Sequence, residues 1–182
     1  MRKTTFALLC AIAVSPYTFA GEFMLTSPQF NQGGRLADEQ VFNGFGCKGA
    51  NISPELNWQN APAGTQSFAI TMYDPDAPTG SGWWHWSLYN IPAGIDGLSK
   101  GASNHPNALP KGSNQGQTDF GKAGYGGPCP PEGDKPHRYQ ITVYALKTDN
   151  IAVAEDAPAA MLGFYLHQNL IEKAVLSGYY SR

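Results

Sequence analysis

The chain is poor in charged residues. Only 14% of its 182 residues are Asp, Glu, Lys or Arg, and the formal net charge is −2. A slightly acidic chain of this kind lacks the basic patch that nucleic acids and anionic membrane surfaces attract. We therefore expect neither nucleic acid nor a membrane surface as a partner.

Long apolar runs are missing as well. The apolar stretch 6–14 follows two basic residues and is shorter than the roughly 20 residues that a membrane-spanning helix needs. Thr18 and Ala20 lie where a signal peptidase reads small residues. We predict a signal peptide over 1–20, followed by a single domain over 21–182. The mature protein should be periplasmic or secreted, with no transmembrane segment.

Cysteine is scarce, and one of the three residues, Cys10, lies in the predicted signal peptide. The other two are Cys47 and Cys129. In an exported protein an even number of cysteines indicates a disulfide, with two separate buried thiols as the alternative. A bridge would tie the loop around Cys129 to the Gly44–Cys47 turn and preorganise that loop for a ligand.

Two enzyme signatures are absent. The chain has neither a His-x-Glu-x-x-His zinc motif nor a Gly-x-Ser-x-Gly nucleophile elbow. The sequence therefore favours a protein that is not an enzyme and has no catalytic residues, metal or cofactor. A metal-dependent hydrolase built on aspartates and histidines stays open as a less favoured alternative.

The residue pattern indicates a mostly β protein, rich in glycine and proline. Strands are expected over 68–73, 84–91 and 137–146, followed by a helix over about 158–174 that Asp156 caps and a short strand over 176–180. Alternation places His85 on one face with Ser87 and Tyr89. It places His137 and Tyr139 together on an apolar face.

Two segments carry the candidate chemistry, and each sets a rigid turn beside a strand that contains a histidine. The first runs from Asp74 through an Asp-Pro-Asp-Ala-Pro turn to the Trp-rich strand with His85. The second runs from the Gly-Gly-Pro-Cys-Pro-Pro loop to His137. Two histidines with glycine N–H donors can hold a phosphate, a sulfate or a carboxylate, and the aspartates can fix histidine tautomers or bind an amine. The alternative is that the aspartates only form turns.

These segments, together with Ser53–Trp58 and Gly178–Arg182, occur in an order that resembles the phosphatidylethanolamine-binding protein family, in its bacterial Raf-kinase-inhibitor-like branch. The resemblance spans nearly the whole mature chain. It implies a large, mainly antiparallel central β-sheet packed on a smaller sheet, with a C-terminal helix near the site. It also implies ligand-binding roles for Asp74, Pro75, Asp76, Trp83, His85, Gly126, Gly127, Pro128, His137, Tyr139 and Tyr180. Cys129 interrupts the Pro-Pro pair of many eukaryotic relatives, which affects the shape of the loop.

The leading interpretation is a non-enzymatic exported binding protein with a small pocket for an anion, phosphate-like or aminophosphate in chemistry. The alternative is an inhibitor of a protease or kinase that acts through its surface on a protein target. Bacterial relatives leave a homodimer open, and composition does not decide it.

Overall fold

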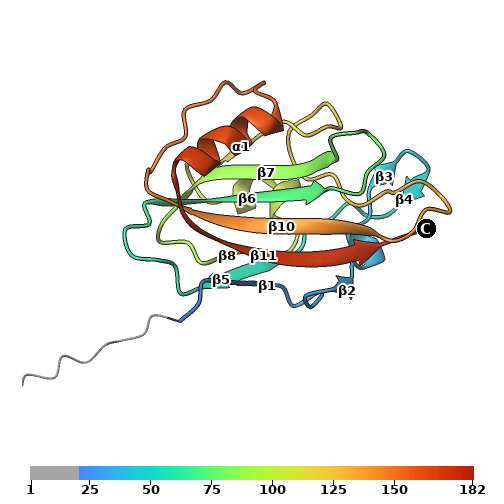
Figure 1. Ribbon diagram of the computed structural model, residues 1–182, viewed down its shortest axis with the longest axis horizontal. Helices are drawn as coiled ribbons and strands as arrows, with labels where there is room; N and C mark the ends of the chain where they lie inside the picture. The colour runs from blue at the N-terminus through green and yellow to red at the C-terminus, as the bar shows by residue number, and fades with distance from the viewer. Residues whose placement is uncertain (1–20) are drawn as a thin grey trace, which may run out of the picture.

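The computed structural model describes residues 21–182, and the predicted signal peptide lies outside them. The fold is mostly β, as predicted, with one large sheet and a smaller one (Figure 1). The large sheet has the strand order β2 (Gly34–Arg35), β11 (Leu170–Tyr180), β10 (His137–Leu146), β6 (Ser67–Asp74), β7 (Trp83–Pro92) and β9 (Asn114–Gln115). All its neighbouring strands are antiparallel except β11 and β2.

The remaining elements are short. The smaller sheet consists of β1 (Met24–Thr26), β5 (Leu56–Gln59) and β8 (Gly97–Leu98), and β3 (Asn43–Gly44) forms a hairpin with β4 (Cys47–Lys48). The 3-10 helices are η1 (Asp38–Gln40), η2 (Ala102–Asn104) and η3 (Pro106–Ala108). In residues 21–182 no helix has the length and apolar character needed to cross a bilayer.

The main hydrophobic core lies between the two sheets. Trp86 of β7 and Ile141 of β10 are fully buried there, and Leu56 and Trp58 of β5 pack against them from the smaller sheet. Because strand side chains alternate between faces, these strands leave a second apolar face on the other side of the large sheet. The helix α1 (Ala159–Gln168) covers part of that face through Leu162 and Leu166 (Figure 1).

The helix is shorter than predicted. It ends at Gln168 rather than near Ala174, and Leu170–Tyr180 forms strand β11 instead. The leucine spacing that favoured a longer helix is overridden because β11 pairs with β10 along its whole length, from Leu170 opposite Leu146 to the far end. Asp156 does not cap the helix either: Pro158 occupies that position without a side-chain hydrogen bond.

The alternation predicted for His85 is also wrong. Met72 pairs with Trp86 and Tyr73 pairs with Trp84, so His85 is an extra residue with no partner on β6. Such a β-bulge re-aims a side chain. The ring of His85 lies 5.1 Å from that of Tyr139, on the core side of the sheet, rather than with Tyr89 on the helix side.

The predicted disulfide is present. Cys47 and Cys129 are joined, with an S–S distance of 2.11 Å and 82 residues of sequence separation. The bond connects the β3–β4 hairpin to the Gly-Gly-Pro-Cys-Pro-Pro loop. In the chain-entropy account, closing so long a loop stabilises the fold by about 4 kcal/mol.

Thiol labelling of the purified, denatured and unreduced protein is expected to find no free cysteine in residues 21–182, since both are in the bridge. Two labelled thiols would contradict the assignment. Reduction should weaken ligand binding more than it disturbs the fold, because the freed segment is the loop beside the pocket. Equal losses of binding and of far-ultraviolet circular dichroism would argue against a preorganising role for the bond.

Candidate functional site

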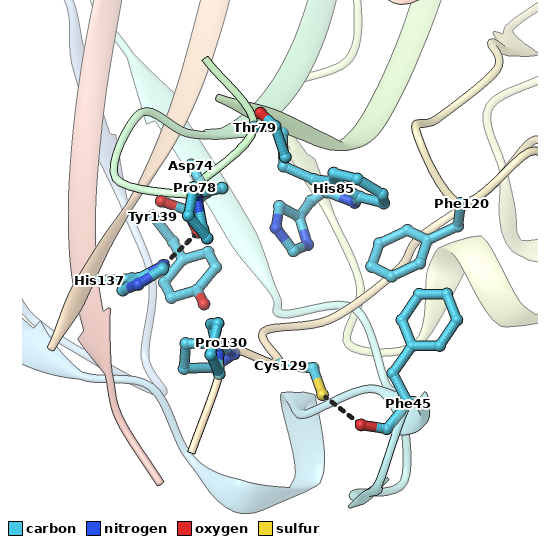
Figure 2. A pocket seen from close by; sticks show the side chains of 13 residues that line it. Phe45, Asp74, Pro78, Thr79, His85, Phe120, Cys129, Pro130, His137 and Tyr139 are labelled. Atoms are coloured by element: carbon cyan, nitrogen blue, oxygen red, sulfur yellow. Dashed lines mark hydrogen bonds and ion pairs between the residues drawn. The ribbon is translucent and has the colours of Figure 1, made fainter. Parts of the chain in front are cut away.

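A cavity of about 170 Å³ opens where three neighbouring strands of the large sheet meet three connections: the β3–β4 turn, the β6–β7 loop and the long segment between β9 and β10. β6 ends there at Asp74, and β7 and β10 begin there, which brings His85 and His137 to the same place. Figure 2 shows this arrangement. The lining residues are Phe45, Asp74, Ala77, Pro78, Thr79, Trp83, His85, Phe120, Cys129, Pro130, Pro131, His137 and Tyr139.

Asp74 fixes the orientation of His137 at one side of the cavity. Both side chains are 3% exposed, and the Nδ1–H of His137 donates to Asp74 Oδ2 at 2.8 Å (Figure 2). The other carboxylate oxygen, Oδ1, accepts the backbone N–H of Asp76 at 2.8 Å. The Nε2 atom of His137 lies 3.4 Å from Asp134 Oδ2. Asp74 therefore sets a histidine tautomer, as the sequence predicted, and also braces the turn.

His85 is held from the opposite side. Its Nδ1 lies 2.7 Å from the carbonyl oxygen of Gly126 and 3.1 Å from that of Gly127. Carbonyl oxygens only accept, so Nδ1 carries the proton. The remaining ring nitrogen, Nε2, makes no hydrogen bond within residues 21–182 and is left for a ligand.

Burial decides the charge of His85. The side chain is almost fully enclosed, and loss of hydration lowers its pKa from 6.5 to about 4, although the Gly126 carbonyl and the charge of Asp74 act in the opposite direction. In the empty pocket His85 is therefore neutral at physiological pH. Its Nε2 becomes a donor only when a bound group favours protonation.

Two further donors at the cavity have no acceptor. Trp83 Nε1 is buried without a hydrogen bond in the described part of the chain, and the O–H of Tyr139 has no acceptor there, although the backbone N–H of Cys129 lies near its oxygen and acts to lower its pKa. Burial raises the pKa of the Tyr139 hydroxyl, with a smaller contribution from the Asp74 charge, so this hydroxyl stays protonated and can donate. Buried polar groups are usually satisfied, and two open donors beside one cavity therefore point to a ligand that satisfies them.

The predicted role of the glycine N–H groups is wrong. Gly126 donates to the carbonyl oxygen of His85 at 2.8 Å, and Gly127 donates to Asn51 Oδ1 at 2.7 Å, so neither is free for an anion. Packing explains these glycines. A Cβ at Gly127 would lie 1.8 Å from the Gln40 carbonyl oxygen, and one at Gly126 would collide with Phe120. The loop positions His85 through the carbonyl oxygens of Gly126 and Gly127, and the N–H groups of these two glycines are already used within the protein.

Six of the residues expected at the ligand do not line the cavity: Pro75, Asp76, Gly126, Gly127, Pro128 and Tyr180. Asp76 braces the site from behind, because its Oδ2 accepts the backbone N–H of Arg138 at 2.9 Å. The Pro128 carbonyl accepts the N–H of Phe42 at 3.0 Å. Tyr180 instead lines a separate surface hollow and lies under the guanidinium of Arg35.

The structure adds an aromatic wall that sequence reasoning missed. Phe45 and Phe120 line the cavity, far apart in sequence from each other and from the histidines. The sequence did offer one signal for Phe45: it lies in the turn that ends at Cys47, and Cys47 was expected to form a disulfide with Cys129. Nothing in the sequence around Phe120 indicated its place.

A metal site is not formed by the described residues: within 21–182, no group of three or more His, Cys, Asp or Glu side chains is arranged to hold an ion.

Comparison with known proteins identifies the family to which the chain belongs. The family model for phosphatidylethanolamine-binding protein matches residues 26–181. The chain is 50% identical to the UPF0098 protein YbcL of Escherichia coli over 162 residues, which is 88% of each chain. It is 48% identical to YbhB of the same organism over 157 residues, 86% of this chain and 99% of YbhB.

Two further matches extend the comparison. The crystal structure of Escherichia coli YbcL superposes with a TM-score of 0.87 over 89% of this chain and 99% of that one. The putative lipoprotein LppC of Mycobacterium tuberculosis is 32% identical over 162 residues, covering 89% of this chain and 72% of LppC. With the family model covering nearly all described residues and a relative at half identity, the chain belongs to the phosphatidylethanolamine-binding protein family, close to the bacterial proteins YbcL and YbhB.

Proposed function

We propose that the protein is an exported, non-enzymatic binding protein whose pocket takes a small anionic group, phosphate-like or aminophosphate in chemistry. One observation carries the proposal. The cavity brings His85, His137 and Tyr139 together from two strands of the large sheet, and its buried polar groups include unsatisfied donors. Membership of the family supports a binding role of the same type.

The donors at the cavity suit an oxyanion, and one of them, His85, must take up a proton before it can donate. Tyr139 Oη and Trp83 Nε1 donate while neutral, and His85 Nε2 donates once it is protonated. Among residues 21–182, no lysine or arginine lines the cavity. An amine on the same ligand would find a carboxylate partner in Asp74, which lines the cavity, and an aminophosphate therefore fits as well as a simple oxyanion.

Export is supported from two directions. A disulfide such as Cys47–Cys129 forms and persists in oxidising compartments. LppC carries the name of a lipoprotein. We place the protein in the periplasm, where such a pocket would meet small phosphorylated molecules or lipid headgroups.

Calorimetric titration with inorganic phosphate and with O-phosphoethanolamine, before and after exhaustive chelation, tests the proposal. Both ligands should bind, and the curves before and after chelation should overlay, because the contacts come from protein side chains. If neither phosphate nor O-phosphoethanolamine binds, the proposal of an anion pocket is wrong. A large loss of affinity on chelation, restored by zinc, would instead favour a metal-dependent enzyme.

A further inference from the structure

Phe45 has an unusual backbone conformation for its residue type. It has a φ of +51°, in the left-handed region, and the other three non-glycine residues with positive φ among residues 21–182 are asparagines. Asparagine tolerates this region, whereas a bulky side chain there is a genuine outlier. Phe45 and Gly46 form the two-residue turn of the β3–β4 hairpin, a position where Asn-Gly is strongly preferred.

Phe45 is also the most exposed of the large hydrophobic residues in the described chain, at 68%. An exposed aromatic ring on a strained turn contributes little to folding, so its position calls for another explanation. Backbone strain of this kind clusters at ligand-binding sites. Phe45 lines the cavity beside Phe120 (Figure 2), and its exposure to solvent places it at the mouth.

The ring continues a wall of aromatic side chains that leads inward. Phe45 stacks on Phe120 with ring centroids 5.7 Å apart, and Phe120 stacks on Phe42 at 4.3 Å. Phe120 also meets Trp83 and His85 edge to face, at 5.4 and 5.3 Å. The wall therefore runs from solvent to the ring whose Nε2 is free for a ligand.

The position of Phe45 is fixed relative to the opposite wall. The disulfide joins the hairpin to Cys129, which lines the cavity together with Pro130. The guanidinium of Arg182 donates to the carbonyl oxygen of Pro130 at 2.6 Å and to that of Phe45 at 3.4 Å. Both sides of the mouth are thus preorganised.

We propose that the pocket selects an oxyanion ester with an aryl substituent: the anionic head meets His85 and Tyr139, and the aryl ring lies between the Phe45–Phe120 wall and Pro130. Phe45 is then the specificity-determining residue. This inference rests on the proposed function and names its ligand class. A bare oxyanion would satisfy the buried donors but would leave the aromatic wall in contact with water.

Three phosphate monoesters test the inference: phenyl, cyclohexyl and methyl phosphate. Phenyl and cyclohexyl phosphate have six ring carbons each, but only the planar ring can stack. The wild-type protein should bind phenyl phosphate about three- to tenfold more tightly than cyclohexyl phosphate. Equal affinities for these two esters would overturn the proposal.

Phe45→Asn removes the ring while supplying the residue that the turn prefers, so the fold should be at least as stable as wild type. This variant should lose the preference for phenyl over cyclohexyl phosphate, and it should lose less affinity for methyl phosphate than for phenyl phosphate. Phe164→Asn, on the exposed side of α1 away from the cavity, is the matched control and should leave all three affinities unchanged.

The outcomes separate this inference from the proposed function. If methyl phosphate binds but Phe45→Asn weakens all three esters equally, or lowers the melting temperature, Phe45 is a structural residue and the specificity proposal is wrong. If methyl phosphate does not bind to the wild type at all, the anion pocket itself is wrong, and the aryl preference falls with it.

Discussion

Asp74→Ala should lower the free energy of unfolding by about 3 kcal/mol and remove most of the phosphate affinity. Asp74 is 2% exposed and satisfies two donors, the Nδ1–H of His137 and the backbone N–H of Asp76, each at 2.8 Å. Alanine leaves both donors without a partner in a site that excludes water. The ring of His137 also loses the contact that fixes its orientation in the pocket.

Two other substitutions make this result interpretable. Asp74→Asn keeps an acceptor for Asp76 and most of the shape, so it should recover much of the stability. Its amide group requires the opposite tautomer of His137, however, and binding should stay impaired. Asp38→Ala removes an exposed carboxylate that pairs with Arg35 at 2.6 Å, and should change the stability by less than about 1 kcal/mol.

Urea unfolding and phosphate titration of these three variants check the expectation. A stability and an affinity for Asp74→Ala that match the Asp38→Ala control would show that the buried Asp74–His137 contact is unimportant.

As the pH falls from about 6 to about 4.5, the affinity for sulfate should rise by about tenfold per pH unit. Burial holds the pKa of His85 at about 4 in the empty pocket, and a bound dianion raises that pKa by favouring the protonated ring. Binding therefore takes up a proton at any pH between the free and the bound pKa. The rise should stop near pH 4, where the free protein is already protonated.

His85→Asn tests the assignment of this proton. The asparagine amide can still donate to the carbonyl oxygens of Gly126 and Gly127 but does not titrate, so sulfate binding should be weaker and its pH dependence flatter. His105→Ala and His167→Ala are controls on exposed side chains and should keep the wild-type slope. A steep slope that survives in His85→Asn would assign the proton to another group.

Strand periodicity predicted part of the site correctly. His137 and Tyr139 lie on the core side of β10, as alternation required, and both line the cavity. Resemblance to the family contributed Asp74, Trp83 and His85, which also line it. These residues could be found because a regular strand, or an ordered set of motifs, carries local information.

The sequence could not reveal features that depend on pairing between distant segments. The bulge that turns His85 toward the core exists only because β6 pairs with β7 in that register. The C-terminal part of the predicted helix is a strand instead, because Leu170–Tyr180 pairs with β10. Gly127 was misread because its close neighbour, the carbonyl of Gln40, is 87 positions away in the sequence.

Nitrogen-15 NMR of the histidine side chains during a sulfate titration at about pH 5.5 tests the central claim most directly. At this pH, above its free pKa of about 4, His85 begins with a protonated Nδ1 and a bare Nε2. As sulfate saturates the pocket, the Nε2 resonance of His85 should move into the protonated range, while His105 and His167 stay unchanged. Sulfate binding that leaves His85 Nε2 bare would show that the anion lies elsewhere and would contradict the account.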